Sequence, residues 1–432
     1  MAKKIKPLYN GAAEELAPGL TEIDGGCTAA KGFAAAGVHA GFKKDPTRLD
    51  FAIVVADEPC PAAATFTQNV FCAAPVIVSR EHLDGIQYGT ARAIVINSGN
   101  ANAATGAIGL DNARTSAQMV ADAVGCTADE VLVASTGVIG MHLPLEPFSA
   151  GIPKALEVLS HDVDAGHTVA RAIMTTDTVP KECAFTFQVE NPVYGGATFT
   201  VGGMSKGSGM IMPNMATMIS VITTDAPIAA IDLRAALSAS VKKSFNKITV
   251  DSDTSTNDSC FSLASGAAAP GAPMMKPGTP EFALFQQALD AVCNNLARKM
   301  AADGEGATRL VTVRVTGAAD DEDADKAART IANSPLVKTA IYGHDANWGR
   351  IAAAAGRSGA RFKQEDVSID IMGMPVCRGG LTVLFDEDEA LRRFEEPEIA
   401  IDINLGAGSA ATRMWTCDFS HDYVTINGDY RT

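Results

Sequence analysis

The hydroxyl of Thr217 lies at the junction between a loop-forming segment and a strand-forming segment. Two glycines and a proline within 207–213 favour a loop before it, and the short apolar run 218–224 after it is rich in β-formers. A threonine hydroxyl placed there can attack the preceding carbonyl, that of Ala216, to give an ester that water opens. The amine released on Thr217 titrates near neutral pH and can take the hydroxyl proton, so one residue supplies both nucleophile and base. An ordinary threonine that opens a strand would show the same local pattern.

A second hydroxyl, that of Ser205, fits a different chemistry. Residues 203–207 match the G-x-S-x-G pattern of a serine hydrolase, and the strand-forming run 197–201 precedes them. His344 or His421 would then be the downstream base. The pattern is weakened because a glycine and a proline in the next segment oppose the helix that should follow the serine. A third interpretation is a metabolite-binding protein whose polar loops contact a ligand without turnover.

Three stretches surround Thr217: 203–211 (GMSKGSGMI), 213–218 (PNMATM) and 223–226 (TTDA). They resemble the processing site of the ornithine acetyltransferase (glutamate N-acetyltransferase) family of arginine biosynthesis. Further blocks at 303–308, 334–350 and 423–432 resemble the same family. The resemblance therefore covers almost the whole chain. It implies that the chain cuts itself between Ala216 and Thr217, and that Thr217 becomes the acyl-accepting nucleophile.

The resemblance also implies the other residues of the site. Thr136 and Gly137 would form an oxyanion hole, because a hydroxyl and a backbone N–H can stabilise the charge that develops on an acyl oxygen. A lysine can bind an amino-acid carboxylate, and a glutamate can bind a cationic amine. The residues implied to contact the substrate are Thr175, Lys206, Thr217, Glu305, Asn427 and Thr432. We assign no role to His344.

The implied reaction is a ping-pong acetyl transfer from N-acetylornithine to glutamate. Whether acetyl-CoA is also a donor stays open, because Met212 occupies a loop position that is often polar in similar sequences. No cofactor is expected beyond acetyl-CoA as a possible substrate. The resemblance implies a dimer of cleaved pairs. A self-processing aminopeptidase of similar architecture is an alternative, although the blocks at 303–308 and 423–432 oppose it.

The apolar runs and amphipathic segments predict an α/β protein, and the resemblance implies layered sheets and helices of the aminopeptidase/ornithine acetyltransferase type. Strands are predicted at 51–56, 74–78, 92–97, 131–140, 309–315 and 399–404, and helices at 111–125, 231–245 and 280–302. Residues 1–50 have the composition of loops, and 251–258 is too polar for a core. We expect the fragments 1–216 and 217–432 to form one interlocked body rather than two domains.

The composition is that of a globular, acidic protein. Its 432 residues are 47% hydrophobic with a formal net charge of −15, which argues against nucleic acids and anionic membranes as partners. Nine cysteines are scattered without a C-x-x-C pair, which is typical of reduced thiols and predicts a cytoplasmic protein. Seven dispersed histidines lack metal-ligand spacing, so no metal is expected. No stretch reaches membrane-spanning length.

Overall fold

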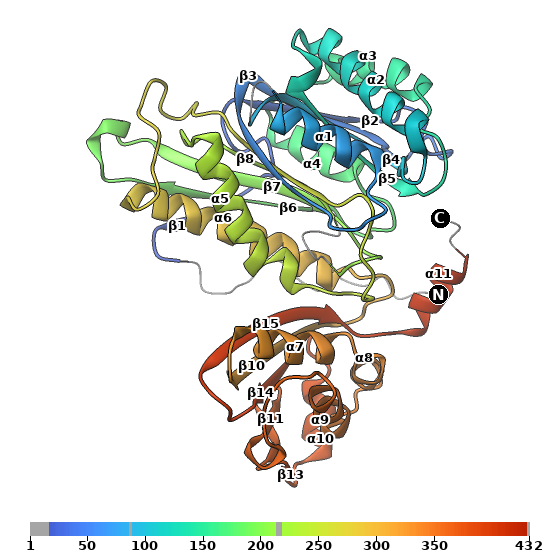
Figure 1. Cartoon of the computed structure of the whole chain (residues 1–432), viewed down its shortest axis with the longest axis vertical. Coiled ribbons are helices and arrows are strands. Elements are labelled where there is room, and N and C mark those ends of the chain that lie inside the picture. The colour runs from blue at the N-terminus through green and yellow to red at the C-terminus, as the bar shows by residue number, and fades with distance from the viewer. Residues whose placement is uncertain (1–16, 86–88, 213–217, 430–432) are drawn as a thin grey trace.

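The computed structural model describes residues 17–85, 89–212 and 218–429 of the chain. Within these residues the larger of two sheets has nine strands in the order β1-β6-β7-β8-β9-β3-β4-β5, with β2 paired to β3 (Figure 1). The strands are β1 (Leu20–Ile23), β2 (Phe33–Val38), β3 (Phe51–Phe66), β4 (Thr90–Asn100), β5 (Val131–Val138), β6 (Lys181–Gln188), β7 (Thr198–Lys206), β8 (Ile219–Thr224) and β9 (Ser259–Ala264). The long strand β3 joins the two halves of the sheet, since it pairs with β2 and β4 and, through its last residues, with β9.

The larger sheet folds over so that two of its faces pack on each other between two layers of helices. One layer has α1 (Ala74–Asp84), α2 (Gly106–Val124) and α3 (Glu146–Glu157), and the other has α5 (Ala230–Lys243) and α6 (Pro280–Ala302). Helix α4 (Val163–Ala172) contributes its buried residues to the core between the two faces. Ile94 of β4 shares one buried cluster with Val221 of β8 and Phe261 of β9. Val95 of β4 faces the cluster under α1–α3, whereas Ile222 of β8 packs against α5 and α6. Neighbouring residues on one strand therefore face different cores. Figure 1 shows α2 and α3 at the top of this lobe and α6 along its lower side.

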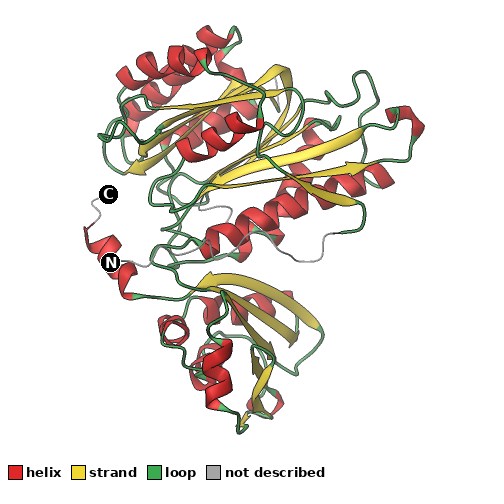
Figure 2. Cartoon of the chain, turned by 180° about the vertical axis from the view of Figure 1, so that it is seen from behind, coloured by secondary structure: helices red, strands yellow, loops and turns green. Residues whose placement is uncertain are grey.

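A smaller lobe follows in the last third of the chain. Its six-stranded sheet has the order β13-β12-β11-β14-β10-β15, and Figure 2 shows both sheets from behind with their covering helices. The elements are β10 (Leu310–Ala318), α7 (Asp321–Ala332), α8 (Pro335–Tyr342), α9 (Trp348–Gly356), β11 (Ser368–Ile371), β12 (Met374–Arg378), β13 (Leu381–Thr382), α10 (Glu387–Arg393), β14 (Glu398–Asn404), β15 (Ala410–Cys417) and α11 (His421–Asp429).

The two lobes are joined by shared packing and by an ion pair. Trp415 of β15 is fully buried and belongs to the core under α5 and α6. Arg298 of α6 contacts the Glu398 carboxylate of β14 at 2.7 Å. Helix α11 leaves the smaller lobe and lies at the side of the molecule (Figure 1). In the described ranges, no helix is long and apolar enough to cross a membrane.

Several expected elements match the structure, and others are corrected. The helix predicted at 280–302 is α6, and layered α/β architecture is confirmed. The strand predicted at 74–78 is wrong, because Pro75 lies in the first turn of α1 and the buried residues follow a helical spacing. The predicted loop 1–50 contains β1 and β2. The segment 251–258, expected outside the core, includes the buried Asn257 and Asp258.

Two adjacent strands from the second half of the sequence lie inside the larger sheet, between strands of the first half. β8 and β9 lie between β7 on one side and β3 on the other. The antiparallel pairing of β7 with β8 extends from Val201–Thr224 to Lys206–Ile219, and β9 pairs with β3 along five residue positions. This arrangement supports the expectation that 1–216 and 217–432 form one body, which stays a prediction.

Candidate active site

Loops from distant parts of the chain enclose a pocket of about 120 Å³. Its walls come from the end of β5, the turn after α4, the end of β7, the loop before β9, the segment after α6, and α11. Six of the residues predicted from the sequence line it: Thr136, Gly137, Thr175, Lys206, Glu305 and Asn427. The fold therefore assembles most of the predicted site around one pocket.

Three predicted residues, Ala216, Thr217 and Thr432, lie outside the described residues. The described chain on either side of 213–217 is held by the segment 251–259, which is the loop 251–258 and the first residue of β9. The N–H of Met212 donates to the Asp253 carbonyl at 2.8 Å, and the Met218 carbonyl accepts from the N–H of Ser259 at 2.8 Å. The same segment thus binds the chain on both sides of the predicted cleavage bond.

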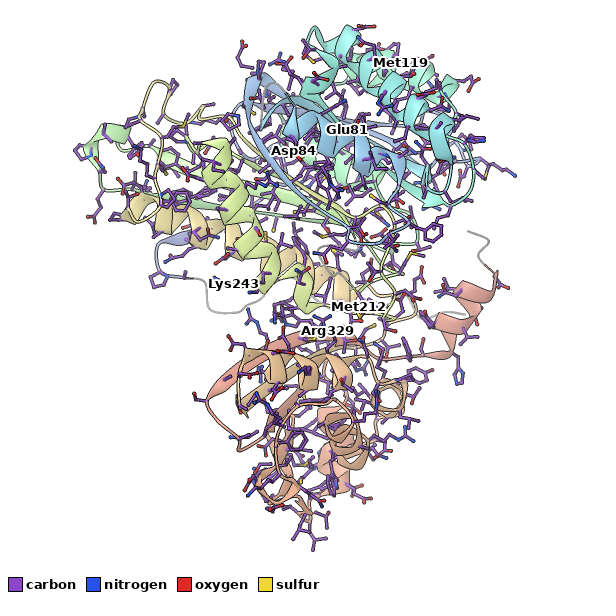
Figure 3. All side chains as sticks on the ribbon, in the orientation of Figure 1. Glu81, Asp84, Met119, Met212, Lys243 and Arg329 are labelled. Carbon is purple, nitrogen blue, oxygen red and sulfur yellow. The ribbon has the colours of Figure 1, made fainter. Side chains whose placement is uncertain are left out.

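A half-buried carboxylate, that of Asp251, shapes the segment that leads to that bond. Asp251 accepts hydrogen bonds from the N–H groups of Met210 and Ile211 at 2.6 and 2.8 Å. Met210 has a positive φ of 56°, an uncommon conformation for a residue with a side chain. Met212 lies against the smaller lobe (Figure 3), where the Asn333 amide donates to its sulfur at 3.2 Å. The segment is therefore fixed from two sides.

Thr136 and Gly137 end β5 at the wall of the pocket. Gly137 has a φ of 136°, and an added Cβ would lie 2.3 Å from the Gly99 carbonyl carbon, so only glycine fits. The ladder between β4 and β5 is irregular at this point, which frees backbone groups from regular pairing. A hydroxyl and an adjacent N–H at a strand end are suitable donors for an oxyanion.

Lys206 is the last residue of β7 and brings a buried ammonium to the pocket. Its side chain is 9% exposed, and Nζ lies 3.4 Å from the Thr136 hydroxyl. Burial lowers its pKa, and the nearby carboxylate of Asp177 opposes that shift. An anionic substrate group would compensate this ammonium better than water can in an enclosed site.

Glu305 supplies the opposite charge. Its carboxylate accepts a hydrogen bond from Asn427 Nδ2 of α11 at 2.8 Å. It also packs directly on Gly209, where an added Cβ would lie 2.4 Å from the carboxyl carbon. The contact with Asn427 explains how a helix without buried residues becomes part of the pocket.

Thr175 is held in the turn after α4 by its backbone. Its N–H donates to Asp177 at 3.0 Å, and its carbonyl accepts from Arg48 at 2.7 Å. Asp177 and its partner Lys181 were not predicted from the sequence as functional residues. The high density of hydroxyl groups beside Asp177 in 172–181 is the sequence feature that could have indicated them.

Ser205 does not have the geometry of a hydrolase nucleophile. Its side chain is buried, and its hydroxyl donates to Met300 Sδ rather than to an imidazole. His344 contacts Arg309, and His421 packs against the Tyr342 ring. Among the described residues, no group of three or more His, Cys, Asp or Glu side chains is arranged to hold a metal ion.

A pocket that brings a hydroxyl and a backbone N–H at a strand end together with a buried lysine and a glutamate fits an enzyme that transfers acyl groups between charged small molecules. The chain belongs to the ArgJ family, whose model matches residues 34–432. This membership confirms the family predicted from the sequence, and with it an acetyl-transferring enzyme of arginine biosynthesis.

Similar proteins cover nearly the full length. The arginine biosynthesis bifunctional protein ArgJ of Chlorobaculum tepidum is 48% identical over 93% of this chain and 96% of its own length. The protein of the same name from Symbiobacterium thermophilum is 47% identical over 95% of this chain and 99% of its own. A solved structure of the Bacillus halodurans ArgJ protein, 46% identical, aligns with 50% of this chain and all of its own, with a TM-score of 0.48.

Proposed function

We propose that the chain carries an acetyl group on Thr217 from N-acetylornithine to glutamate. The observation that carries this proposal is the pocket in which Lys206 and Glu305 accompany the donor pair of Thr136 and Gly137. Both amino acids bear a carboxylate and an ammonium, so a lysine and a glutamate can hold their charged ends. Because this pocket is small, it favours sequential use, in which ornithine leaves before glutamate binds.

Self-cleavage would first create the nucleophile. Thr217 Oγ attacks the Ala216 carbonyl carbon, the C–N bond breaks, and the nitrogen of Thr217 takes the hydroxyl proton. Water then hydrolyses the ester, which leaves a carboxylate on Ala216 and a free hydroxyl on Thr217. The hydrogen bonds from the segment 251–259 to Met212 and Met218 support this step, because they fix the chain on both sides of the bond.

Each half reaction then uses the same groups. In the first, Thr217 Oγ gives its proton to its own α-amine and bonds to the acetyl carbon of N-acetylornithine. The bond from that carbon to nitrogen breaks, and the ornithine amine leaves with the proton. In the second, the glutamate amine attacks the acetyl ester and Thr217 regains a proton. Thr136 and Gly137 stabilise the oxyanion in both steps.

A second donor and a larger assembly belong to the same proposal. The relatives named above are called bifunctional, which supports acetyl-CoA as another acetyl donor. No resident cofactor is needed, since the nucleophile, its base and the oxyanion donors are residues of the chain. We propose a dimer of cleaved pairs, measurable by light scattering. All nine cysteines are free thiols, which supports a cytoplasmic location.

The test is a mass measurement on protein incubated with N-acetylornithine alone. We expect two fragments in place of the 44.8 kDa chain, with one acetyl group on the fragment that begins at Thr217. Glutamate should remove the label and appear as N-acetylglutamate, and acetyl-CoA in a separate incubation should add the same label. Thr217→Ala should stay uncut and unlabelled. A fully active but intact chain would refute the proposal, and a label lost equally fast without glutamate would indicate a hydrolase.

A further inference from the structure

A buried group of three charges lies behind the wall of the pocket. The Lys181 ammonium contacts Asp177 Oδ1 at 2.7 Å and Asp303 Oδ2 at 2.5 Å, and the lysine side chain is fully buried. The three residues come from the turn after α4, the start of β6 and the end of α6. Two carboxylates against one ammonium leave one excess negative charge. Such a charge is costly inside a protein unless another group compensates it.

Asp177 connects this ion triad to two of the candidate substrate contacts. It accepts the N–H of Thr175 at 3.0 Å through one oxygen and the N–H of Gly207 at 2.7 Å through the other. Gly207 directly follows Lys206, so one carboxylate fixes the backbone at both Thr175 and Lys206. Water could not take the place of either N–H as a hydrogen-bond donor to Asp177, because the Asp177 side chain is completely buried.

Asp303 connects the triad to the other two contacts. Its carbonyl accepts the Ser208 hydroxyl at 2.6 Å, and the Ser208 carbonyl accepts the N–H of Glu305 at 3.0 Å. Glu305 in turn accepts from Asn427. Hydrogen bonds therefore connect the Lys181 ammonium to all four of these substrate contacts. The path runs through Asp177 to Thr175 and Lys206, and through Asp303 and Ser208 to Glu305 and Asn427.

Besides fixing the backbone, the triad changes the electrostatic environment of Lys206. The charged groups that act on Lys206 come from five different segments and are Asp177, Lys181, Glu305, Asp258 and Lys43. Burial lowers the pKa of Lys206, and Asp177 is the strongest group that raises it. In Asp177 itself burial opposes ionisation, but the charges of Lys181 and Lys206 outweigh it and lower the pKa.

We propose that Asp177 is a positioning residue for substrate binding, whose excess negative charge is the counter-charge of Lys206 and whose carboxylate fixes the segments of Thr175 and Lys206. This inference rests on the proposed function, in which the Lys206 ammonium binds a substrate carboxylate. The Lys181 ammonium lies between Asp177 and Asp303, and its positive charge allows both carboxylates to stay ionised. Carboxylate binding is then lost as pH rises through the pKa of Lys206, and removal of Asp177 brings that loss to lower pH.

The decisive variant is Asp177→Asn, because it removes one charge and leaves Lys181 paired with Asp303. The matched control is Asp225→Asn. Asp225 is also a buried carboxylate that accepts two backbone N–H groups, from Thr200 at 2.7 Å and Lys31 at 3.1 Å, but it lies at the opposite end of β8. Circular dichroism and thermal melting would establish that each variant is folded.

The main readout is the pH dependence of Lys206 methylation by formaldehyde and a hydride reductant, followed by peptide mass spectrometry. Only the neutral amine reacts, so the pH of half-maximal labelling reports the protonation of Lys206 directly. We expect that pH to fall by at least about one unit in Asp177→Asn and to stay unchanged in Asp225→Asn. At pH 8 the KM for both amino acids should rise about tenfold or more in Asp177→Asn, with kcat within about threefold.

A second variant has the opposite expected sign. Lys181→Met removes a positive charge that acts on Lys206. Of the two carboxylates left behind, Asp177 is the one that Lys206 still stabilises as an anion, so half-maximal labelling should move to higher pH. If neither triad variant folds, the labelling of the parent protein tests the inference. Half-maximal labelling below pH 7 would show that Asp177 does not stabilise the charged form of Lys206, and would contradict the inference. A folded Asp177→Asn protein with the parent labelling profile would also overturn the inference. Failure of N-acetylornithine to slow Lys206 labelling in the parent would instead count against the proposed function.

Discussion

Substitution of Gly209 by alanine should move the Glu305 carboxylate without unfolding the protein. The added Cβ would lie 2.4 Å from the carboxyl carbon and from one oxygen, and 2.5 Å from the other. A relaxed contact needs about 3.5 Å, so the carboxylate must retreat by about 1 Å. The hydrogen bond to Asn427, now 2.8 Å, would then exceed hydrogen-bonding distance. The φ of Gly209 is not in the positive range, so the backbone accepts alanine and a flexible side-chain end takes up the clash.

A misplacement of about 1 Å at a binding group costs about a hundredfold in kcat/KM, or about 2.7 kcal/mol of transition-state stabilisation. Two-substrate kinetics with N-acetylornithine and glutamate would measure this loss, and thermal melting would check the fold. Gly356→Ala is the matched control, because its added Cβ meets nothing within 4 Å at the end of α9. A folded Gly209→Ala protein with parental kcat/KM would refute the placement of Glu305 in the substrate site.

Three further substitutions test other parts of the structure. Thr136→Val keeps the shape but removes the hydroxyl, and we expect kcat to fall about a hundredfold to a thousandfold, measured after cleavage has been verified by mass spectrometry. Asn427→Ala removes the amide that holds Glu305, which should raise the KM for the amino-acid substrates about tenfold with little change in kcat. Lys43, whose Nζ donates to the carbonyl of Met174 at 2.7 Å, has its pKa lowered by burial from 10.5 to about 8. Between pH 8 and 10.5 the unfolded state therefore binds more protons, so the parent should gain stability relative to Lys43→Gln as pH rises, in denaturant titrations at several pH values.

Segments with strong local periodicity were predictable from the sequence. Helix α6 has an N-cap threonine, a proline in the first turn and a long amphipathic pattern, and its predicted bounds match. The strand predicted at 74–78 was wrong. Its β-branched residues have strand propensity, but packing against β3 and β5 favours a helix there. α11 was not predicted because no residue in it is buried, so its sequence has no apolar stripe.

The candidate site was predictable only through the family resemblance. That resemblance indicated Thr136, Lys206 and Glu305, and the structure places these residues around one pocket. The ion triad was not predictable, because Lys181 and Asp303 are far apart in sequence and no local pattern indicates their contact. Nor could the composition of 251–258 show that a polar segment is buried, since its hydrogen-bond partners come from other parts of the chain.

The position of β8 and β9 between β7 and β3 has a consequence for how a cut chain would behave in denaturant. Scission between Ala216 and Thr217 would remove the covalent link between β7 and β8 but none of the hydrogen bonds between those strands. Unfolding would then release two separate polypeptides, so stability would depend on protein concentration. Refolding would require the second polypeptide to insert two strands into the middle of a sheet that the first cannot complete. We therefore expect hysteresis: the mature protein should resist denaturant for long times, yet fail to recover on dilution, while an uncut Thr217→Ala chain refolds.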